Sequence, residues 1–152
     1  MNLRKSFQSD GGDLVAYTSE THLVVRYAET DMMGIVHHSR YYPWFEQART
    51  DFVKKIGTTY SGLEQAGILL PLTQTHCKYI YALTYEDEVL VTCRLEKLSV
   101  ARMGFVYEVF RKRDMLKMSE GRTEHGIVGK DMRPINLKKT FPKIWDDLTA
   151  LL

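Results

Sequence analysis

The stretch that decides the fold is RYAETDMMGIVHHSRYYPWFEQAR, residues 26–49. It joins a polar loop, which carries Asp31, Gly34 and two adjacent histidines, to an aromatic run with helical spacing. A helix that only fills a core needs none of these polar groups, whereas a functional site at a helix entrance does. The first N–H groups of a helix have no internal partner and the helix dipole adds positive potential, so this entrance favours an anion.

The helix itself is predicted from apolar residues that recur on one face, at Tyr41, Phe45, Ala48, Phe52 and Ile56. Gly57 is a natural stop for such a helix. Pro43 is best tolerated in a first turn and disfavours helical geometry in the residue before it. Ser39 is therefore the preferred N-cap. Together these signals predict one long helix between Ser39 and Gly57.

Most of the remaining chain reads as antiparallel strands. The segment THLVVRY (21–27) is rich in β-branched and aromatic residues, and long strands continue from about residue 70 to residue 130. Buried and exposed positions are expected to alternate at Val89, Val91, Cys93 and Leu95 against Thr92, Arg94 and Glu96, and at Cys77, Tyr79 and Tyr81 against His76 and Lys78. Turns are expected at 101–104 and 112–114, and a short amphipathic helix at 141–152.

Length and pattern together predict one α+β domain. The chain has 152 residues, enough to bury a core without disulfides or a metal. Residues 1–13 are polar and aperiodic and read as a loose leader, which leaves 14–152 as a single domain. One helix covers only part of an antiparallel sheet, so we expect a second subunit to cover more of it.

Charge and cysteine content exclude several classes of protein. The 21 basic and 19 acidic residues give a net charge of +2, unlike the strongly basic balance of nucleic-acid binders. Cys77 and Cys93 lie in strand-like runs without a CxxC motif, as expected of free thiols in a reducing compartment. No segment approaches the roughly 18 apolar residues of a membrane span, and none resembles a signal peptide. We expect a cytoplasmic protein without nucleic-acid or membrane partners.

The polar groups around the helix entrance suit the hydrolysis of an acyl group. The glycine-containing loop can turn back over the helix end and bring Asp31 beside N–H donors that would stabilise an oxyanion. A serine or cysteine triad is not indicated, because Ser39 lacks a GxSxG context and neither cysteine has a plausible base nearby in the sequence. Asp31 is thus the leading candidate for the chemistry.

Two other polar features have simpler interpretations. His37 and His38 suggest a metal site, but adjacent side chains near a helix start are expected to point apart, and no further ligands occur at suitable spacing. No metal is therefore predicted. Glu46 is a second carboxylate on the helix, and we expect it to pair with Arg49 or Thr50 one turn later.

Residues 27–49 resemble the signature of the hotdog-fold acyl-CoA thioesterases, in particular the YbgC/FadM group related to 4-hydroxybenzoyl-CoA thioesterase. The shared pattern is an aspartate, two residues, Gly-[Ile/Val]-Val, an aromatic residue or histidine, a histidine, two residues and a tyrosine, followed by aromatic–Glu–x–Ala–Arg. The order of helix and strands extends the likeness over about 20–145. The resemblance implies the hotdog fold, a long central helix wrapped by a five-stranded antiparallel sheet. It also implies acyl-CoA hydrolysis without a cofactor.

Carried over to this chain, the resemblance makes Asp31 the catalytic carboxylate, either as nucleophile or as base for a water molecule. The backbone N–H of His38 becomes the donor to the thioester carbonyl, and its ring orients the aspartate or the substrate. The implied substrate-binding positions are Gly34, Val36, His37 and Tyr41. His37 stands where the family often has tyrosine. The family's site lies between two subunits, which implies a homo-oligomer, either a dimer or a homotetramer.

Two rival functions share this pattern. One is a thioesterase that acts on acyl-carrier-protein esters, and the other is a hotdog protein that binds acyl-CoA without hydrolysing it. The set formed by Asp31, Gly34 and His38 argues against the second, because a binder needs no carboxylate at the scissile carbon. The basic residues 111–113, Lys130 and Arg133 either hold CoA phosphates or form solvated strand ends.

Overall fold

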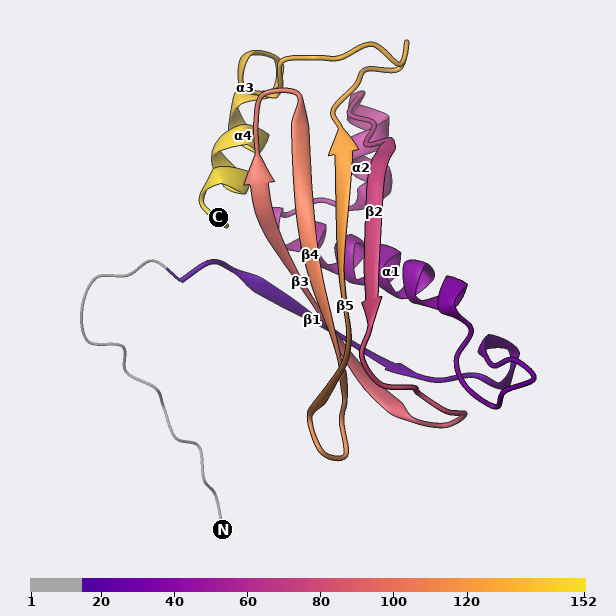
Figure 1. Cartoon of the computed structure of the whole chain (residues 1–152). Helices are drawn as coiled ribbons and strands as arrows, with labels where there is room; N and C mark the ends of the chain where they lie inside the picture. Colours follow the sequence, from indigo (N-terminus) through magenta and orange to yellow (C-terminus); the bar gives the residue numbers. More distant parts are fainter. Residues whose placement is uncertain (1–14) are drawn as a thin grey trace, which may run out of the picture.

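One five-stranded antiparallel sheet forms the body of the protein (Figure 1). The computed structural model describes residues 15–152, so the leader predicted at 1–13 lies outside the described residues. The strands are β1 (Thr18–Val24), β2 (Leu72–Tyr79), β3 (Glu88–Leu98), β4 (Arg102–Arg111) and β5 (Leu116–Gly126). All neighbouring strands are antiparallel, in the order β1-β3-β4-β5-β2, which places β1 and β2 at the edges. The predicted α+β class is confirmed.

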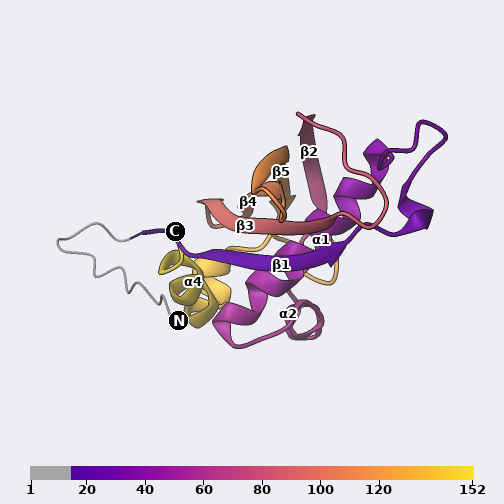
Figure 2. The ribbon, with the colours of Figure 1, turned by 90° about the horizontal axis from the view of Figure 1, so that it is seen from below.

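The long helix α1 (Tyr41–Val53) lies along one face of the sheet and contacts β1, β3 and β4 (Figure 2). The 3₁₀ turns η2 (His38–Arg40) and η3 (Lys54–Ile56) extend it, and Gly57 ends it with a φ of 79°, as predicted. The predicted N-cap is wrong, because the chain enters α1 through η2 and Ser39 lies inside that turn. The shorter helices are η1 (Tyr27–Glu29), α2 (Tyr60–Ala66), α3 (Leu137–Thr140) and α4 (Pro142–Thr149). None of the helices in the described part of the chain could cross a lipid bilayer.

One aromatic side chain of α1 packs directly over a glycine of the sheet. Phe45 of α1 stacks on Tyr107 of β4, with ring centroids 4.6 Å apart and planes 16° from parallel. A methyl group at Gly121 of β5 would lie only 2.3 Å from the Phe45 ring. Carbon atoms in contact are normally about 3.5 Å apart or more. A side chain at Gly121 would therefore displace the ring and, with it, α1.

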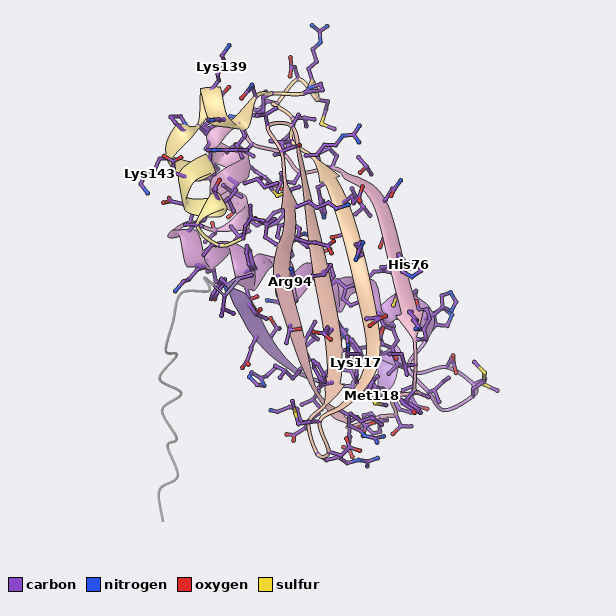
Figure 3. All side chains as sticks on the ribbon, turned by 60° about the vertical axis from the view of Figure 1, so that its left-hand side comes forward. His76, Arg94, Lys117, Met118, Lys139 and Lys143 are labelled. Atoms are coloured by element: carbon purple, nitrogen blue, oxygen red, sulfur yellow. The ribbon has the colours of Figure 1, made fainter. Side chains whose placement is uncertain are left out.

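The predicted alternation is confirmed on β3 and wrong on β2. Val89, Val91, Cys93 and Leu95 are buried beneath α1, while polar side chains such as that of Arg94 project from the opposite face of the sheet (Figure 3). By contrast, β2 is exposed along both faces except at the half-buried Cys77, because it lies at the edge of the sheet. The helix α1 lies mainly over β1, β3 and β4 and meets β2 at its end, where Tyr41 packs on Tyr79. The predicted turn at 112–114 is confirmed, whereas the preceding turn falls at 99–101 and Gly104 is already paired within β4.

Candidate functional site

Asp31 lies at the tip of a short hairpin that directly precedes α1. Thr30 and Val36 form a bridge across this hairpin, and the Gly34 N–H donates to the Asp31 carbonyl at 2.9 Å. Gly34 has a φ of +77°, a left-handed conformation that glycine adopts without strain. The Oδ1 atom of Asp31 accepts the N–H of Met33 at 2.8 Å. No hydrogen bond to its Oδ2 occurs in the described part of the chain, so one carboxylate oxygen anchors the turn and the other is available for chemistry.

Asp31 and the entrance to α1 line one pocket of about 220 Å³. The hairpin and the helix entrance contribute Asp31, Met33, Ile35, Val36, His38 and Tyr41, and the end of β2 with the segment after it contributes Tyr79, Ile80, Tyr81 and Ala82. The structure thus brings together four of the six predicted site residues. Gly34 and His37 do not line the pocket, because Gly34 shapes the hairpin turn and His37 caps η2.

The turn η2 presents His38 to the pocket and is held on both sides. The Nδ1 atom of His37 accepts the Ser39 N–H at 3.3 Å. The carbonyl of His38 accepts the hydroxyl of Tyr79, which reaches across from the edge strand, at 2.9 Å. The N–H of His38, by contrast, donates to no atom within residues 15–152. An unpaired N–H at this position suits an oxyanion.

The expectation that the two histidines point apart is wrong. The ring centroids of His37 and His38 lie 4.1 Å apart, and the ring planes differ by 33°. His37 is extended while His38 begins a 3₁₀ turn, so both rings fall on the same side of the chain. No group of three or more histidine, cysteine, aspartate or glutamate side chains arranged for a metal ion occurs among the described residues.

Two tyrosines form the wall of the pocket opposite the hairpin. The rings of Tyr41 and Tyr79 meet edge to face, with centroids 5.0 Å apart. Burial, together with the nearby Cys77, raises the pKa of Tyr41 to about 12, and burial also raises the pKa of Tyr79. Both phenols therefore keep their protons at neutral pH, and that of Tyr79 donates to the carbonyl of His38. Sequence reasoning treated Tyr79 only as a strand residue, although the apolar run YIYAL at a strand end was a signal.

A line of polar side chains runs beneath α1 through the core. Arg49 donates to the Tyr107 hydroxyl at 3.0 Å, and that hydroxyl lies 2.7 Å from the Thr123 hydroxyl. The His125 ring continues the line, with Nε2 3.0 Å from Thr123 Oγ1 and Nδ1 3.0 Å from the carbonyl of Leu70. Burial and, secondly, the charge of Arg49 lower the pKa of His125 to about 4. The ring is therefore neutral at pH 7, and the line ties α1 to β4 and β5.

Two predicted interactions of basic residues have different outcomes. The predicted pairing of Glu46 with Arg49 or Thr50 is not found among the described residues: Glu46 is exposed, whereas Arg49 turns inward to the hydroxyls of Tyr60 and Tyr107. At the end of β4, Arg111 forms an ion pair with Asp114 at 2.6 Å. This pair favours a solvated strand end over a phosphate site at residues 111–113.

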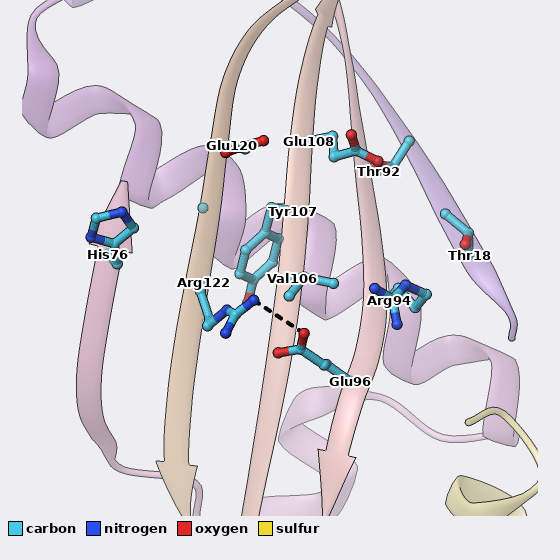
Figure 4. Close-up of a pocket in the computed structure, with 11 residues that line it drawn as sticks. Thr18, His76, Thr92, Arg94, Glu96, Val106, Tyr107, Glu108, Glu120 and Arg122 are labelled. Carbon is cyan, nitrogen blue, oxygen red and sulfur yellow. Dashed lines mark hydrogen bonds and ion pairs between the residues drawn. The ribbon is translucent and has the colours of Figure 1, made fainter. Parts of the chain in front are cut away.

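A larger hollow of about 640 Å³ lies on the outer face of the sheet, away from α1 (Figure 4). Most of its charged side chains are paired, although Arg94 has no ion pair among the described residues. Arg122 pairs with Glu96 at 3.1 Å, and on the same face Lys117 pairs with Glu108 and with Glu120. Because most of these charges are already matched, this surface reads as a solvated sheet face, and the smaller pocket at the helix entrance is the better candidate for chemistry.

Comparison with known proteins identifies the relatives of this chain. Residues 25–150 match the family model of the thioesterase-like superfamily. The chain belongs to this superfamily. The Bacillus subtilis protein named "Putative acyl-CoA thioesterase YneP" is 32% identical over 127 residues, which cover 83% of this chain and 91% of that protein. The acyl-CoA thioesterase YbgC of Haemophilus influenzae is 28% identical over 120 residues, 78% of this chain and 85% of that protein.

A solved structure agrees with this placement in the thioesterase-like superfamily. The DHNA-CoA thioesterase of Staphylococcus aureus superposes with a TM-score of 0.81 and 35% sequence identity, covering 88% of this chain and 92% of that one. The predicted hotdog fold and the predicted thioesterase family are therefore confirmed. The roles of Asp31, His38 and the substrate-binding residues stay predictions.

Proposed function

We propose that this member of the thioesterase-like superfamily hydrolyses an acyl-CoA thioester to a carboxylic acid and free CoA. The observation that carries the proposal is that Asp31 and His38, a residue whose backbone N–H is unpaired among the described residues, line one pocket at the entrance to α1. Thioester hydrolysis needs a carboxylate that attacks or activates water and donors that stabilise the oxyanion. The relatives named as acyl-CoA thioesterases support a CoA ester as the substrate.

In the proposed reaction, the thioester carbonyl accepts the N–H of His38 at the positive end of the helix dipole. Asp31 either removes a proton from the attacking water or attacks the carbonyl itself, in which case water then hydrolyses the resulting anhydride. The oxyanion collapses and expels the CoA thiolate, which takes up a proton. Val36 and Tyr41 hold the acyl group, Gly34 and His37 shape the loop around it, and no cofactor takes part.

We also propose a homo-oligomer, a dimer or a tetramer, joined at the edge of the sheet. β2 supports this assembly, because it is an edge strand with both faces open and with exposed apolar side chains at Leu72 and Tyr79. The segment after β2 lines the pocket, so a subunit docked there would close it. Light scattering at micromolar concentration tests the assembly, and a stable, active monomer would contradict it. The free thiols of Cys77 and Cys93 support a cytoplasmic location.

The decisive experiment measures CoA release from a panel of acyl-CoA esters by the parent and by Asp31→Asn. Asparagine keeps the shape of the side chain, so we expect the melting temperature and the affinity for a non-hydrolysable acyl-CoA analogue to stay close to those of the parent. Turnover should fall by about 10²- to 10⁴-fold, as is typical when a general base is lost.

Asp131→Asn is a matched control, because the Oδ1 of Asp131 accepts the N–H two residues later, from Arg133, at 3.1 Å. Asp31 makes the same kind of turn, but Asp131 lies outside the pocket. If Asp31→Asn lost no more activity than the control, Asp31 would be only a turn residue. Activity on acyl-carrier-protein esters alone would favour the other class of thioesterase.

A further inference from the structure

One buried carboxylate close to the pocket has no part in the proposed chemistry. Glu29 ends η1, two residues before Asp31, and only 4% of its surface is exposed. Burial of a carboxylate is costly unless donors compensate for the lost water. The donors that surround Glu29 therefore show which parts of the fold it holds together.

The carboxylate of Glu29 connects the end of the β1 segment to the start of α1. Its Oε2 accepts the backbone N–H of Arg26 at 2.8 Å, and its Oε1 accepts the Arg26 guanidinium at 3.3 Å. On the other side, Oε1 accepts the indole N–H of Trp44, in the first turn of α1, at 3.0 Å. The Trp44 side chain is itself buried, so this bond is shielded from water.

The backbone of the same residue closes the hairpin that carries Asp31. The carbonyl of Glu29 accepts the N–H of His37 at 2.8 Å, directly beyond the bridge between Thr30 and Val36. Glu29 thus stands at the stem of the hairpin, with Asp31 on one arm and His37 at the end of the other. The same residue is bonded through its side chain to the helix and through its backbone to the residue that precedes His38.

We infer that Glu29 is a positioning residue, which fixes the Asp31 carboxylate relative to the N–H of His38. The inference rests on the proposed function, since it assigns Glu29 a role in that reaction without contact with the substrate. Rotation of the hairpin against α1 would separate the two groups, and the Glu29 carboxylate is the side chain that joins the hairpin stem to Trp44.

Replacement of Glu29 by glutamine should loosen this connection while preserving its size. The amide oxygen of Glu29→Gln can still accept the Trp44 N–H, but its NH₂ group would face the backbone N–H of Arg26, so that two donors oppose each other. A misplacement of 1 Å in an active site can cost about 10²-fold in rate. We expect kcat to fall by roughly 10- to 100-fold with an unchanged KM, because Glu29 does not line the pocket.

Asp51→Asn provides a matched control at the other end of α1. The Asp51 carboxylate accepts the hydroxyl of Thr21 at 2.7 Å and so ties the helix to β1, far along α1 from the pocket. Both substitutions should lower the melting temperature, but only Glu29→Gln should lower kcat, measured well below melting. Trp44→Phe removes the indole donor and should reproduce the loss, which keeps the inference testable if Glu29→Gln does not fold.

Two further readouts separate positioning from simple stability. In an Asp31→Asn background, Glu29→Gln should cause no additional loss of the residual activity, because the group being positioned is already disabled. Amide hydrogen exchange at His37 should accelerate in Glu29→Gln and stay unchanged in Asp51→Asn. The exchange measurement needs no turnover, so it tests the connection even if the parent releases no CoA and the proposed function fails.

Three results would overturn the inference. One is an unchanged kcat in both Glu29→Gln and Trp44→Phe, which would leave Glu29 with a role in stability alone. The second is unchanged exchange at His37. The third is a loss in the Asp31→Asn background as large as in the parent background, which would show that Glu29 acts independently of Asp31.

Discussion

The folded chain should lose stability as the pH falls from 7 to 5, and His125 is the reason. Its side chain is 1% exposed, and burial followed by the charge of Arg49 lowers its pKa from 6.5 to about 4. Below pH 6.5 the unfolded chain binds a proton at this residue and the folded chain does not, so acid favours unfolding until the pH nears 4. For these two pKa values, the free energy of unfolding falls by about 2 kcal/mol between pH 7 and pH 5.

The hydrogen bonds around the His125 ring also predict that protonation destabilises the folded chain. A neutral His125 accepts the Thr123 hydroxyl at Nε2 and donates its Nδ1–H to the carbonyl of Leu70, while Tyr107 donates to Thr123 and Arg49 donates to Tyr107. Every donor in this line has one acceptor. A protonated ring would present a second N–H to Thr123, and the hydroxyl protons could then no longer all be accommodated.

Urea unfolding of the parent and of His125→Gln at pH 7, 6, 5 and 4 measures the effect. The parent should lose about 2 kcal/mol more than the variant between pH 7 and pH 5, because the glutamine does not titrate. Equal losses in the two proteins would refute the reasoning, since they would show that the His125 ring titrates alike in the folded and unfolded chains. The comparison removes the contribution of the exposed histidines, which both proteins share.

Two further predictions concern packing and the pocket wall. Gly121→Ala puts a methyl group 2.3 Å from the Phe45 ring and should cost about 1–3 kcal/mol in urea unfolding, whereas Gly104→Ala, with its nearest neighbour at 3.6 Å, should cost nothing. Equal effects would contradict this account of the close approach. Tyr79→Phe removes the hydroxyl that holds η2, and kcat should fall by roughly tenfold. This loss is smaller than the ~10²-fold loss of rate that a 1 Å misplacement can cause. Tyr81→Phe is the control. If it lowered kcat as much as Tyr79→Phe, the loss would come from any change in the pocket wall and not from the bond to η2.

The fold and the candidate site could be predicted to the extent that their signals are adjacent in the sequence. The loop with Asp31, the helix spacing and the family pattern all lie within residues 26–49, and the predicted fold class and family are confirmed. Contacts between segments far apart in the chain could not be predicted from the sequence. Tyr79 reaches His38 from 41 residues away, and the inward turn of Arg49 depends on a tyrosine on β4.

The wrong predictions of the helix start and of β2, and the omission of Glu29, have different physical reasons. Serine is a residue type favoured at N-caps, so Ser39 looked like the start of the helix. A 3₁₀ turn and an α-helix can begin with the same residue types, so the sequence does not distinguish the two kinds of helix start. The exposure of β2 depends on how far α1 reaches across the sheet, which is a property of the packed molecule. Glu29 was overlooked because its partner Trp44 is 15 residues away and the intervening hairpin was read only as a loop.

The pocket is built from two stretches that are attached to the rest of the fold in different ways. In the proposed reaction, residues 31–41 supply the carboxylate, the N–H donor and the helix entrance, and they are tied to the core through the hairpin and α1. Residues 79–82 supply mainly an apolar wall, at the exposed end of an edge strand. Apart from Tyr79, whose hydroxyl holds η2, residues of the second stretch can be mutated to reshape the space for the acyl group without disturbing the first. Under the proposed function, substitutions at residues 80–82 would change which acyl group the pocket accepts and leave the reacting groups in place.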